Sequence, residues 1–460
     1  MKSNIIVVGL GISGIAAARL LKDEGHQITI IDQQDNPEIQ SKAHELSKEG
    51  INIELGKDLN IQAFKPWISK QLSSVIISPG IPWDHPTLDQ LRKEGIKIKS
   101  EISLGWEYLK KFPWIGVTGT NGKTTVTYLI NHILEKNDVL APMGGNTGLA
   151  STSLALEINQ KKQIPPDLLV IELSSYQIET APEILPFIGI WTTFTADHLE
   201  RHGTIEAYYS IKKNLLERSN IKILNADDPE INKQRKSLKN AIWVSCQSPF
   251  NGNDANQFWI DKQGYIVENN VKLFNSLELH LPGKHNLQNL LIATATARQL
   301  GVPAEGIRKS LSSFQGVPHR LEKVGLINGI EVINDSKATN YEAARIGLKA
   351  IKEKMVVIAG GRLKKGDPSK WLEEIHSRVH SVILFGEGGK ELEKILKKSG
   401  FKGKLAYCIN LQDAVFIGLE LAKTYKIRHL ILSPACASFD QYKNFEERGN
   451  HFQEIIRRAR

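Results

Sequence analysis

Short apolar segments rich in isoleucine and valine alternate along this chain with stretches of helical periodicity, and this alternation is the strongest constraint on its fold. Several segments are apolar at almost every position, which is typical of parallel strands covered on both faces. Strands that alternate with helices predict α/β domains with mainly parallel sheets. The clearest expected strands are Ile5–Val8, Ile28–Ile31, Val75–Ile77, Ile115–Thr118, Leu168–Glu172, Ile221–Asn225, Met355–Ala359, Val382–Phe385 and Leu430–Ser433.

The chain of 460 residues is too long for a single hydrophobic core. We expect a first boundary near residue 105, before a new strand, loop and helix, and a second near residue 315, where Gly316–Pro318 interrupts a helix-rich region. These boundaries predict domains at residues 1–105, 106–315 and 316–460. Residues 235–282 are less regular, and short antiparallel strands are expected there at Ile242–Ser245, Gln257–Ile260, Tyr265–Val267 and Leu277–Leu281.

Composition excludes several classes of protein. The net charge is +9, but the lysines are scattered and are not interleaved with stacking aromatic residues, so we expect no nucleic-acid partner. A positive field also suits a small polyanionic substrate. Three cysteines without C-x-x-C spacing argue against disulfides and a zinc cluster, and fit a reducing cytoplasm. The sequence contains no uninterrupted run of about 18 apolar residues, so it predicts no membrane span.

The first glycine loop is Gly9-Leu10-Gly11-Ile12-Ser13-Gly14, between an expected strand and a helix that we expect to end at Gly25. A second strand ends at Asp32, where a ribose-binding acid would lie. The pattern suggests NAD, but backbone N–H groups at a helix N-terminus bind any pyrophosphate, including that of a UDP-sugar. A purely structural turn is the third interpretation. This loop alone does not decide the function.

The second glycine loop, Gly119-Thr120-Asn121-Gly122-Lys123-Thr124-Thr125, favours ATP. It lacks the usual G-x-x-x-x-G-K-[ST] spacing, because Val117 stands where a glycine is expected. The chemistry is preserved nevertheless: the glycines let backbone amides face phosphate oxygens, Lys123 reaches the β- and γ-phosphates, and the Thr124 hydroxyl can bind Mg²⁺. Such a loop between a strand and a helix is rarely a coincidence.

This second loop resembles the ATP loop of the Mur ligases and of the related folylpolyglutamate synthetases. Other segments resemble the same family in the same order, so the resemblance covers essentially the whole chain: Gly144–Gly148, Glu172–Gln177, Asp197–His202, Asn225–Asp228, Gly283–Asn286 and Asn334–Asn340. The block Leu432–Gly449 and the segment Ser78–Ile81 are similar to the members that add D-glutamate. The Asp-Asn-Pro-Arg type of motif of members that add diaminopimelate or lysine is not found.

The resemblance implies a three-domain α/β fold, with a Rossmann-like N-terminal domain for a UDP substrate, a central P-loop-type ATPase domain with a mainly parallel sheet, and a Rossmann-like C-terminal domain for D-glutamate. It implies a monomeric cytoplasmic ligase that joins D-glutamate to UDP-N-acetylmuramoyl-L-alanine in peptidoglycan precursor synthesis. The L-alanyl carboxylate would attack the γ-phosphate of ATP, and the D-glutamate amine would then displace phosphate from the acyl phosphate.

Site residues are also implied by this resemblance. The residues expected to act in catalysis are Lys123, Glu172, His198, Lys212 and Lys364. Those expected to bind ATP are Gly119, Thr120, Asn121, Gly122, Lys123, Thr124, Thr125, Asn286, Asn289, Arg320 and Asp335. Two Mg²⁺ ions are expected on Thr124, Glu172, His198 and a carbamylated Lys212. Those expected to bind the other substrates are Ile12, Ser13, Asp32, Gln33, Ser78, Asn146, Lys337, Thr339, Ser438, Phe439 and Phe445.

At two positions this sequence departs from the family pattern. The glycine pair Gly360-Gly361 is followed by both Lys364 and Lys365, where the family has one lysine and then glycine; Lys364 keeps the spacing and is preferred. Gln33 stands where a threonine is common, so a uracil contact from that position stays open.

The spacing of apolar residues after Lys212 predicts the orientation of its side chain without using the resemblance. Leu215 and Leu216 follow at i+3 and i+4, so Lys212 shares the apolar face of its helix and is predicted to point into the protein. Its neighbour Lys213 is the better candidate for solvent.

Several other functions compete with this interpretation. An NAD-dependent oxidoreductase explains the first loop but leaves the second loop and the C-terminal block unexplained. A nucleic-acid-binding protein would need a recognition module that the sequence lacks. Another Mur ligase or a folylpolyglutamate synthetase shares the ATP loop, but the synthetases generally lack the roughly 100 residues that precede it here.

Overall fold

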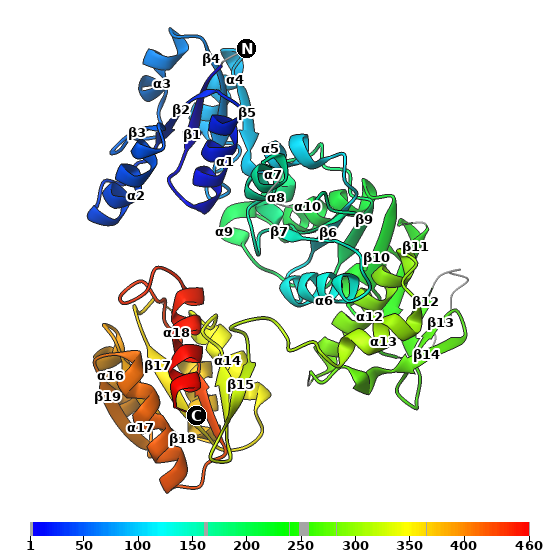
Figure 1. The fold of residues 1–460 in the computed structure, drawn as a ribbon, viewed down its shortest axis with the longest axis vertical. Coiled ribbons are helices and arrows are strands. Elements are labelled where there is room, and N and C mark those ends of the chain that lie inside the picture. Colours follow the sequence, from blue (N-terminus) through cyan, green and yellow to red (C-terminus); the bar gives the residue numbers. More distant parts are fainter. Residues whose placement is uncertain are drawn as a thin grey trace. The chain divides into compact units, whose positions relative to one another are not determined.

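A computed structural model describes residues 3–160, 164–238, 240–247, 257–281, 283–364 and 366–459. Within them the chain forms three sheets with helices between the strands, as the alternation predicts (Figure 1). The sheets belong to two compact units, one of residues 1–280 and 284–314 and one of residues 281–283 and 315–460. The expected boundary at 105 falls inside a helix, Glu101–Leu109, whereas the second unit begins at Gln315.

The first sheet of unit 1 is parallel throughout, in the strand order β3-β2-β1-β4-β5. Its order reverses beside β1, so the carboxyl end of β1 lies at a topological switch point, where α/β sheets bind ligands. The strands are β1 Asn4–Val8, β2 Gln27–Ile31, β3 Asn52–Glu54, β4 Leu72–Ile77 and β5 Lys97–Ser100. The helices are α1 Ile12–Asp23, α2 Pro37–Lys48, α3 Ile61–Ile68, α4 Pro86–Lys93 and α5 Glu101–Leu109.

Helix α1 ends where the sequence predicts. Gly25 has a φ of +85°, a left-handed conformation that glycine adopts without strain. The N–H groups of Gly25 and His26 donate to the carbonyls of Lys22 and Leu21, at 2.9 and 3.1 Å. These two bonds form a Schellman motif that satisfies carbonyls of the last helical turn.

The second sheet of unit 1 has nine strands in the order β14-β13-β12-β11-β10-β9-β6-β8-β7. Its strands are β6 Trp114–Thr118, β7 Met143–Gly145, β8 Leu169–Glu172, β9 Ile188–Trp191, β10 Ile221–Asn225, β11 Ala241–Ser245, β12 Gln257–Ile260, β13 Tyr265–Glu268 and β14 Val271–Asn275. Its helices are α6 Lys123–Glu135, α7 Ser151–Asn159, α8 Ser175–Glu179, α9 Leu199–His202, α10 Ile205–Glu217, α11 Pro229–Asn232, α12 Lys284–Gln299 and α13 Ala304–Leu311, with 3₁₀ turns at Lys233–Lys236 and Ser276–Glu278.

Two expectations for residues 235–282 are wrong. Strands β11 and β12 pair in parallel, and only β13 and β14 are antiparallel additions. Every residue of β11 and β12 is buried, which fits strands covered on both faces. The expected strand at Leu277–Leu281 is absent from the described structure, because the Asn275 side chain accepts the Leu277 N–H at 3.0 Å and begins the 3₁₀ turn Ser276–Glu278; the strand lies earlier, at Val271–Asn275.

The first two sheets share one hydrophobic core. Ile5 and Val7 of β1 lie in the same buried cluster as Leu154 of α7 and Leu169 of β8. Ile6 and Val8 face the opposite side of the first sheet, with Phe64 and Leu88. Helix α7 contacts both α1 and α5, so a helix of the central region packs against two helices of the N-terminal part. This shared core explains why unit 1 contains two sheets.

Unit 2 contains a six-stranded sheet in the order β15-β16-β20-β17-β18-β19, in which only β15 is antiparallel to its neighbour. Along β17, Val357 and Ala359 face one buried cluster while Val356 and Ile358 face another, so both faces of the sheet are covered. The strands are β15 Glu322–Ile327, β16 Ile330–Asn334, β17 Met355–Gly360, β18 Val379–Phe385, β19 Lys404–Cys408 and β20 His429–Leu432. The helices are α14 Tyr341–Ala350, α15 Ser369–Arg378, α16 Gly389–Lys398, α17 Leu411–Thr424 and α18 Phe445–Arg458.

Candidate active site

The second glycine loop joins the fully buried strand β6 to α6, as predicted. Gly119 and Gly122 have φ of +148° and +83°, which side chains rarely adopt. A Cβ at Gly119 would collide with Thr192 Oγ1, and one at Gly122 would lie 2.8 Å from Asn289 Oδ1. No side chain caps α6. The loop therefore presents a helix N-terminus in the form that binds phosphate groups.

Two lysine side chains meet at one carbonyl of this loop. Lys123 Nζ donates to the carbonyls of Gly119 and Thr120 at 2.8 and 2.9 Å. Lys212 Nζ, from α10, donates to the same Gly119 carbonyl at 3.0 Å and lies 3.3 Å from Thr118 Oγ1. The sequence alone did not predict that these two lysines share an acceptor.

Lys212 points into the protein, as its position on α10 predicts. It is 1% exposed, whereas Lys213 is partly exposed and pairs with Glu217 at 3.1 Å. Burial, followed by the neighbouring Lys123 charge, lowers the pKa of Lys212 well below its ordinary value, while Asp197 and Glu172 oppose the shift. A lysine with such a pKa has a larger neutral fraction near pH 7, and a neutral amine is a nucleophile.

Glu172, the last residue of β8, is buried at the carboxyl edge of the sheet. Its Oε1 accepts a hydrogen bond from Asn146 Nδ2 at 2.8 Å, and its main-chain carbonyl accepts the Asn146 N–H at 2.9 Å. The other oxygen, Oε2, is buried and has no hydrogen-bond partner among the described residues. A buried carboxylate oxygen normally has a partner, so Oε2 is suited to a cation.

His198 lies half-exposed in the turn before α9, with a φ of +53°. Its ring is 5.2 Å from that of Tyr176, and its nitrogens lie 3.5 Å from Asp197 and 3.7 Å from Glu200. The structure thus places the predicted histidine among carboxylates and aromatic rings.

Tyr208 was not predicted as a site residue, yet it links two that were. Its hydroxyl lies 3.1 Å from Thr120 Oγ1, and its ring lies 4.7 Å from Lys212 Nζ. Tyr208 precedes Lys212 by four residues on α10, so helical spacing was the available signal.

The residues near the loop fit a magnesium ion that keeps water and phosphate ligands. Within the described residues, no three His, Cys, Asp or Glu side chains are grouped closely enough to hold a metal ion by themselves. Mg²⁺ is usually bound by one or two carboxylates together with substrate phosphates and waters. The unpartnered Glu172 Oε2 provides such a carboxylate, and the partly exposed Thr124 lies in the first turn of α6, next to the loop.

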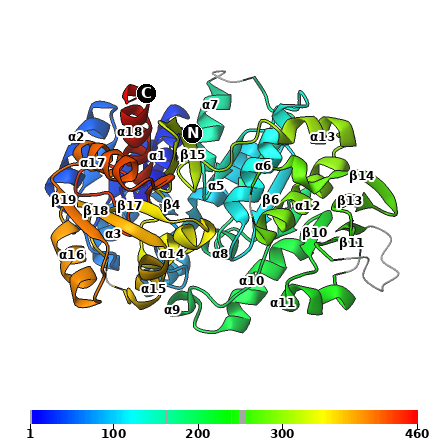
Figure 2. The same cartoon turned by 90° about the horizontal axis from the view of Figure 1, so that it is seen from below.

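Helix α12 borders the loop with the two predicted asparagines. It packs against α6 (Figure 1 and Figure 2). Asn289 is buried, and its Nδ2 donates to Asn286 Oδ1 at 3.3 Å across the i, i+3 spacing. Two predicted nucleotide-binding residues thus lie on one helical face beside Gly122.

In the first glycine loop the three glycines serve different purposes. Gly9 has a φ of +100°, which makes the tight turn after β1. A Cβ at Gly14 would collide with the Gly9 carbonyl, so Gly14 allows close packing of α1. A Cβ at Gly11 would meet nothing within 4 Å, so the backbone there is open to a ligand. This division is the one found in pyrophosphate-binding loops.

The predicted substrate residues around this loop come from three strand ends. Asp32 accepts the N–H groups of Leu10 and Gln34 at 2.6 and 2.8 Å, so it holds the loop as well as bordering it. Ser78 donates to the Val8 carbonyl at 2.9 Å. Gln33 is exposed and donates to Asp58 at 2.9 Å. At the start of α1, Ser13 is partly exposed and Ile12 is 80% exposed, which is unusual for a large apolar residue.

In unit 2 the predicted residues follow the adjacent strands β16, β20 and β17. Asp335 is buried, and burial raises its pKa to about 7, against opposing effects of Ser433 and Arg320. Its oxygens accept from Ser433 Oγ at 3.0 Å and from the Leu321 N–H at 3.3 Å. Arg320 itself is exposed.

The predicted D-glutamate residues lie at the carboxyl edge of the same sheet. Lys337 Nζ lies 5.4 Å from the ring of Phe445, the first residue of α18. Ser438 is buried, Thr339 is partly exposed and Phe439 is 55% exposed. Lys364 is exposed in the loop after β17. Lys365, the alternative, lies outside the described residues.

Arg448 was missed by sequence reasoning. It is fully buried on α18, and its guanidinium donates to Ser336 Oγ and Ser336 O at 3.0 and 2.8 Å and to the Cys436 carbonyl at 3.1 Å. It lies 3.5 Å from the Gly360 carbonyl. Burial lowers its pKa to about 10, so it stays charged near neutral pH. One cation thus ties the end of β17 to the loops after β16 and β20.

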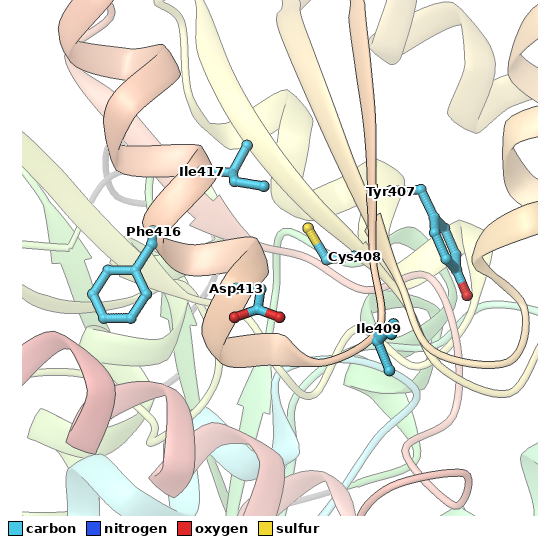
Figure 3. Close-up of a pocket in the computed structure, with 6 residues that line it drawn as sticks. All are labelled: Tyr407, Cys408, Ile409, Asp413, Phe416 and Ile417. Carbon is cyan, nitrogen blue, oxygen red and sulfur yellow. The ribbon is translucent and has the colours of Figure 1, made fainter.

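Two other features lie apart from the predicted residues. A shallow pocket at the end of β19 and the start of α17 contains none of them; Figure 3 shows its lining residues, Tyr407, Cys408, Ile409, Asp413, Phe416 and Ile417. None of the helices in the described part of the chain combines the length and apolar character needed to cross a membrane.

The fold and the two loops define a nucleotide-binding α/β protein with one loop suited to a pyrophosphate and one suited to a reacting triphosphate. Residues 3–100 match the family described as Mur ligase MurD-like, N-terminal domain. Residues 117–297 match the Mur ligase middle domain, and residues 319–433 match the Mur ligase glutamate ligase domain. The chain belongs to the Mur ligase family, whose members depend on ATP and use Mg²⁺.

Similarity to individual proteins extends over the whole chain. It is 54% identical over 451 residues to the UDP-N-acetylmuramoylalanine–D-glutamate ligase of Prochlorococcus marinus (strain MIT 9313), covering 98% of each chain. It is 49% identical to the ligase of the same name from Synechococcus sp. (strain CC9605), again covering 98% of each. Among solved structures, the UDP-N-acetylmuramate-alanine ligase of Thermotoga maritima has a TM-score of 0.60 at 18% identity, covering 99% of this chain and all of that one. That likeness supports the fold.

Proposed function

We propose that this chain is an ATP-dependent ligase that joins D-glutamate to UDP-N-acetylmuramoyl-L-alanine in peptidoglycan precursor synthesis. The observation that carries the proposal is the 54% identity, over 98% of both chains, to a ligase named for that reaction. Its assigned regions are residues 1–105 for the UDP substrate, 106–315 for ATP and 316–460 for D-glutamate. All substrates are small and soluble, so the proposal needs neither nucleic acid nor membrane, and we expect a cytoplasmic monomer.

The first chemical step is assigned to the second glycine loop. The L-alanyl carboxylate attacks the γ-phosphorus, its bond to the bridging oxygen of ADP breaks, and an acyl phosphate forms. Both reactants are anionic, so the step needs positive charge held in place. Lys123, with its ammonium group on two loop carbonyls, is positioned to provide that charge.

When bound, Mg²⁺ would neutralise further negative charge by acting as a Lewis acid on phosphate oxygens. We assign two ions to Thr124, Glu172, His198 and Lys212. The unpartnered oxygen of Glu172 supports its assignment, and the surrounding Asp197 and Glu200 carboxylates support that of His198.

Lys212 is assigned a role as its carbamate. An ammonium group would repel Mg²⁺, whereas a carbamate offers the anionic oxygen ligands that this ion prefers. The neutral amine attacks the carbon of CO₂, one proton leaves, and an N-carboxylate remains. The lowered pKa of Lys212 supports this step, because it increases the fraction of neutral amine.

In the second step the D-glutamate amine attacks the acyl carbon and phosphate leaves from the tetrahedral intermediate. We assign D-glutamate to Lys337, Thr339, Lys364, Ser438, Phe439 and Phe445. Two lysines in this set suit a substrate with two carboxylates. The UDP moiety is assigned to Ile12, Ser13, Asp32, Gln33 and Ser78, the muramoyl part to Asn146, and ATP further to Asn286, Asn289, Arg320 and Asp335.

A phosphate-release assay tests the proposal. The chain is incubated with ATP, Mg²⁺ and UDP-N-acetylmuramoyl-L-alanine, and D-glutamate is compared with L-glutamate, L-alanine and diaminopimelate. We expect phosphate release with D-glutamate alone, and a product heavier by one glutamyl residue in mass spectrometry. Equal or faster release with another amino acid would assign the chain to a different ligase reaction.

A further inference from the structure

Glu101, the first residue of α5, is a buried carboxylate whose described hydrogen-bond partners are all neutral. It is 1% exposed. Its Oε1 accepts from Ser151 Oγ and from the Thr152 N–H, each at 2.8 Å, and from Thr152 Oγ1 at 2.9 Å. Burial raises its pKa and these hydrogen bonds oppose the rise. Because three groups donate to Oε1, this oxygen is the acceptor in all three hydrogen bonds.

The partners of Glu101 form the first turn of α7, a helix without a cap of its own. The residue before it is Ala150, which provides no side-chain hydrogen bond to the helix. The first N–H groups of a helix lack partners within it, and a side chain usually satisfies one of them. Here Glu101 does so from about 50 residues upstream, because its Oε1 accepts the Thr152 N–H.

Helix α7 directly follows the segment that contains the predicted substrate residue Asn146. At the start of this segment, Asn146 contacts Glu172 through its side chain at 2.8 Å and its N–H at 2.9 Å. Gly145 has a φ of +95°, and its N–H donates to the Leu149 carbonyl at 2.9 Å. The segment 145–150 therefore lies between two buried carboxylates, Glu172 at its start and Glu101 at its end.

Helix α5 and the end of β5 are fixed by further contacts to the segment that joins α8 to β9, so Glu101 has a defined position. Ser100 Oγ donates to the Thr180 carbonyl at 3.2 Å, and Ser103 Oγ donates to Glu183. A Cβ at Gly105 would collide with Ser151, so α5 and α7 approach closely only because that residue is glycine.

We propose that Glu101 is a positioning residue for the sugar-nucleotide substrate: it fixes the first turn of α7 and thereby holds Asn146 against Glu172. The inference rests on the proposed function, in which Asn146 contacts that substrate. Because the contact acts through Asn146, losing Glu101 affects the KM for UDP-N-acetylmuramoyl-L-alanine and leaves the KM for ATP nearly unchanged.

The first test is steady-state kinetics of E101A and E101Q. We expect E101A to raise the KM for the UDP substrate about tenfold, since small misplacements of a binding group have effects of this order. E101Q keeps an acceptor oxygen and should recover most of the loss. E107A is the matched control, because Glu107 is an exposed glutamate on the same helix. If E101A folds poorly, T152V removes one donor to Oε1 and should raise the same KM by a smaller factor.

A double-mutant cycle with N146A separates positioning from general structural support. If Glu101 acts through Asn146, E101A/N146A should have the same KM for the UDP substrate as N146A alone. Multiplying effects, or equal losses in the KM for ATP and the UDP substrate, would overturn the inference. Activity of the unmodified enzyme tests the proposed function separately. If the unmodified chain does not join D-glutamate to the UDP substrate, the proposed function is wrong; if it does, the variants test the role of Glu101.

Discussion

The two glycine loops of unit 1 have the same backbone design and opposite electrostatic surroundings. Each follows a buried strand beside a reversal of strand order, makes its first turn with a glycine at positive φ and leads into a helix. The first has an anion as its neighbour, since Asp32 accepts the Leu10 N–H. The second has the Lys123 ammonium group on the Gly119 carbonyl. The backbone geometry selects phosphate, and the surrounding charge determines whether the phosphate is held or reacts.

This difference separates a binding loop from a reaction loop. Backbone N–H groups and a helix dipole bind a pyrophosphate without lysines. Transfer of a phosphoryl group needs additional charge that is already in place, because negative charge is redistributed in the transition state. Loss of charge at the second loop should therefore reduce kcat, and changes at the first loop should mainly raise KM.

The largest effect is expected from K212A. It removes the group assigned to the metal-binding carbamate, so kcat should fall by about 10³-fold or more, as for other charge-stabilising groups in phosphoryl transfer. Steady-state phosphate release measures the loss, and millimolar formate or acetate should restore part of it. K213A, on the adjacent residue, should stay within about twofold. High activity of K212A in CO₂-depleted buffer would refute the carbamate.

A smaller but still large effect is expected when one glycine of each loop is replaced by alanine. G119A forces a side chain into a φ of +148° and against Thr192, so we expect kcat to fall by about 10²-fold. G11A meets no neighbour within 4 Å and should fold normally while raising the KM for the UDP substrate alone. Thermal unfolding of both variants checks the fold. Equal losses in both would remove the distinction between the loops.

D32A tests the first loop through its charge. It removes the acceptor of two backbone N–H groups, so the loop should lose order and the KM for the UDP substrate should rise about tenfold. The KM for ATP should not change. Titration calorimetry with UDP-N-acetylmuramoyl-L-alanine provides an independent measurement, and saturable NADH binding instead would contradict the assignment.

The smallest effect is a gain of stability in K212M. The pKa of Lys212 is well below its ordinary 10.5, so between the two values the unfolded chain binds a proton that the folded chain does not. Stability of the unmodified chain therefore rises with pH in that window. Methionine binds no proton, so K212M should melt higher by about 1–3 °C at about pH 7 and by less at about pH 9.5 in CO₂-depleted buffer. A difference that grows with pH would contradict the assigned protonation.

Local patterns predicted much of this molecule. Periodicity identified the buried strands and the inward orientation of Lys212, and glycine spacing identified both loops and the end of α1. The strand expected at Leu277–Leu281 was wrong because a side-chain hydrogen bond from Asn275 outweighed an apolar run. Glu101 and Arg448 were not predictable in this way. Their burial depends on partners about 50 and 112 residues away, which no local pattern encodes. The roles assigned to the site residues remain predictions.

The packing of α7 against α1 and α5 has a consequence for the exchange of segments between related chains. Leu154 and Ala155 of α7 share a core with residues of α1, and Asn159 and Gln160 hydrogen-bond to Glu24 and Asp23 at the end of that helix. An exchange of residues 1–105 between two relatives would leave the incoming sheet against a helix that evolved with another sheet. The part that packs together is therefore discontinuous in sequence: the first sheet and its helices, which end at Leu109, together with α7, which begins at Ser151.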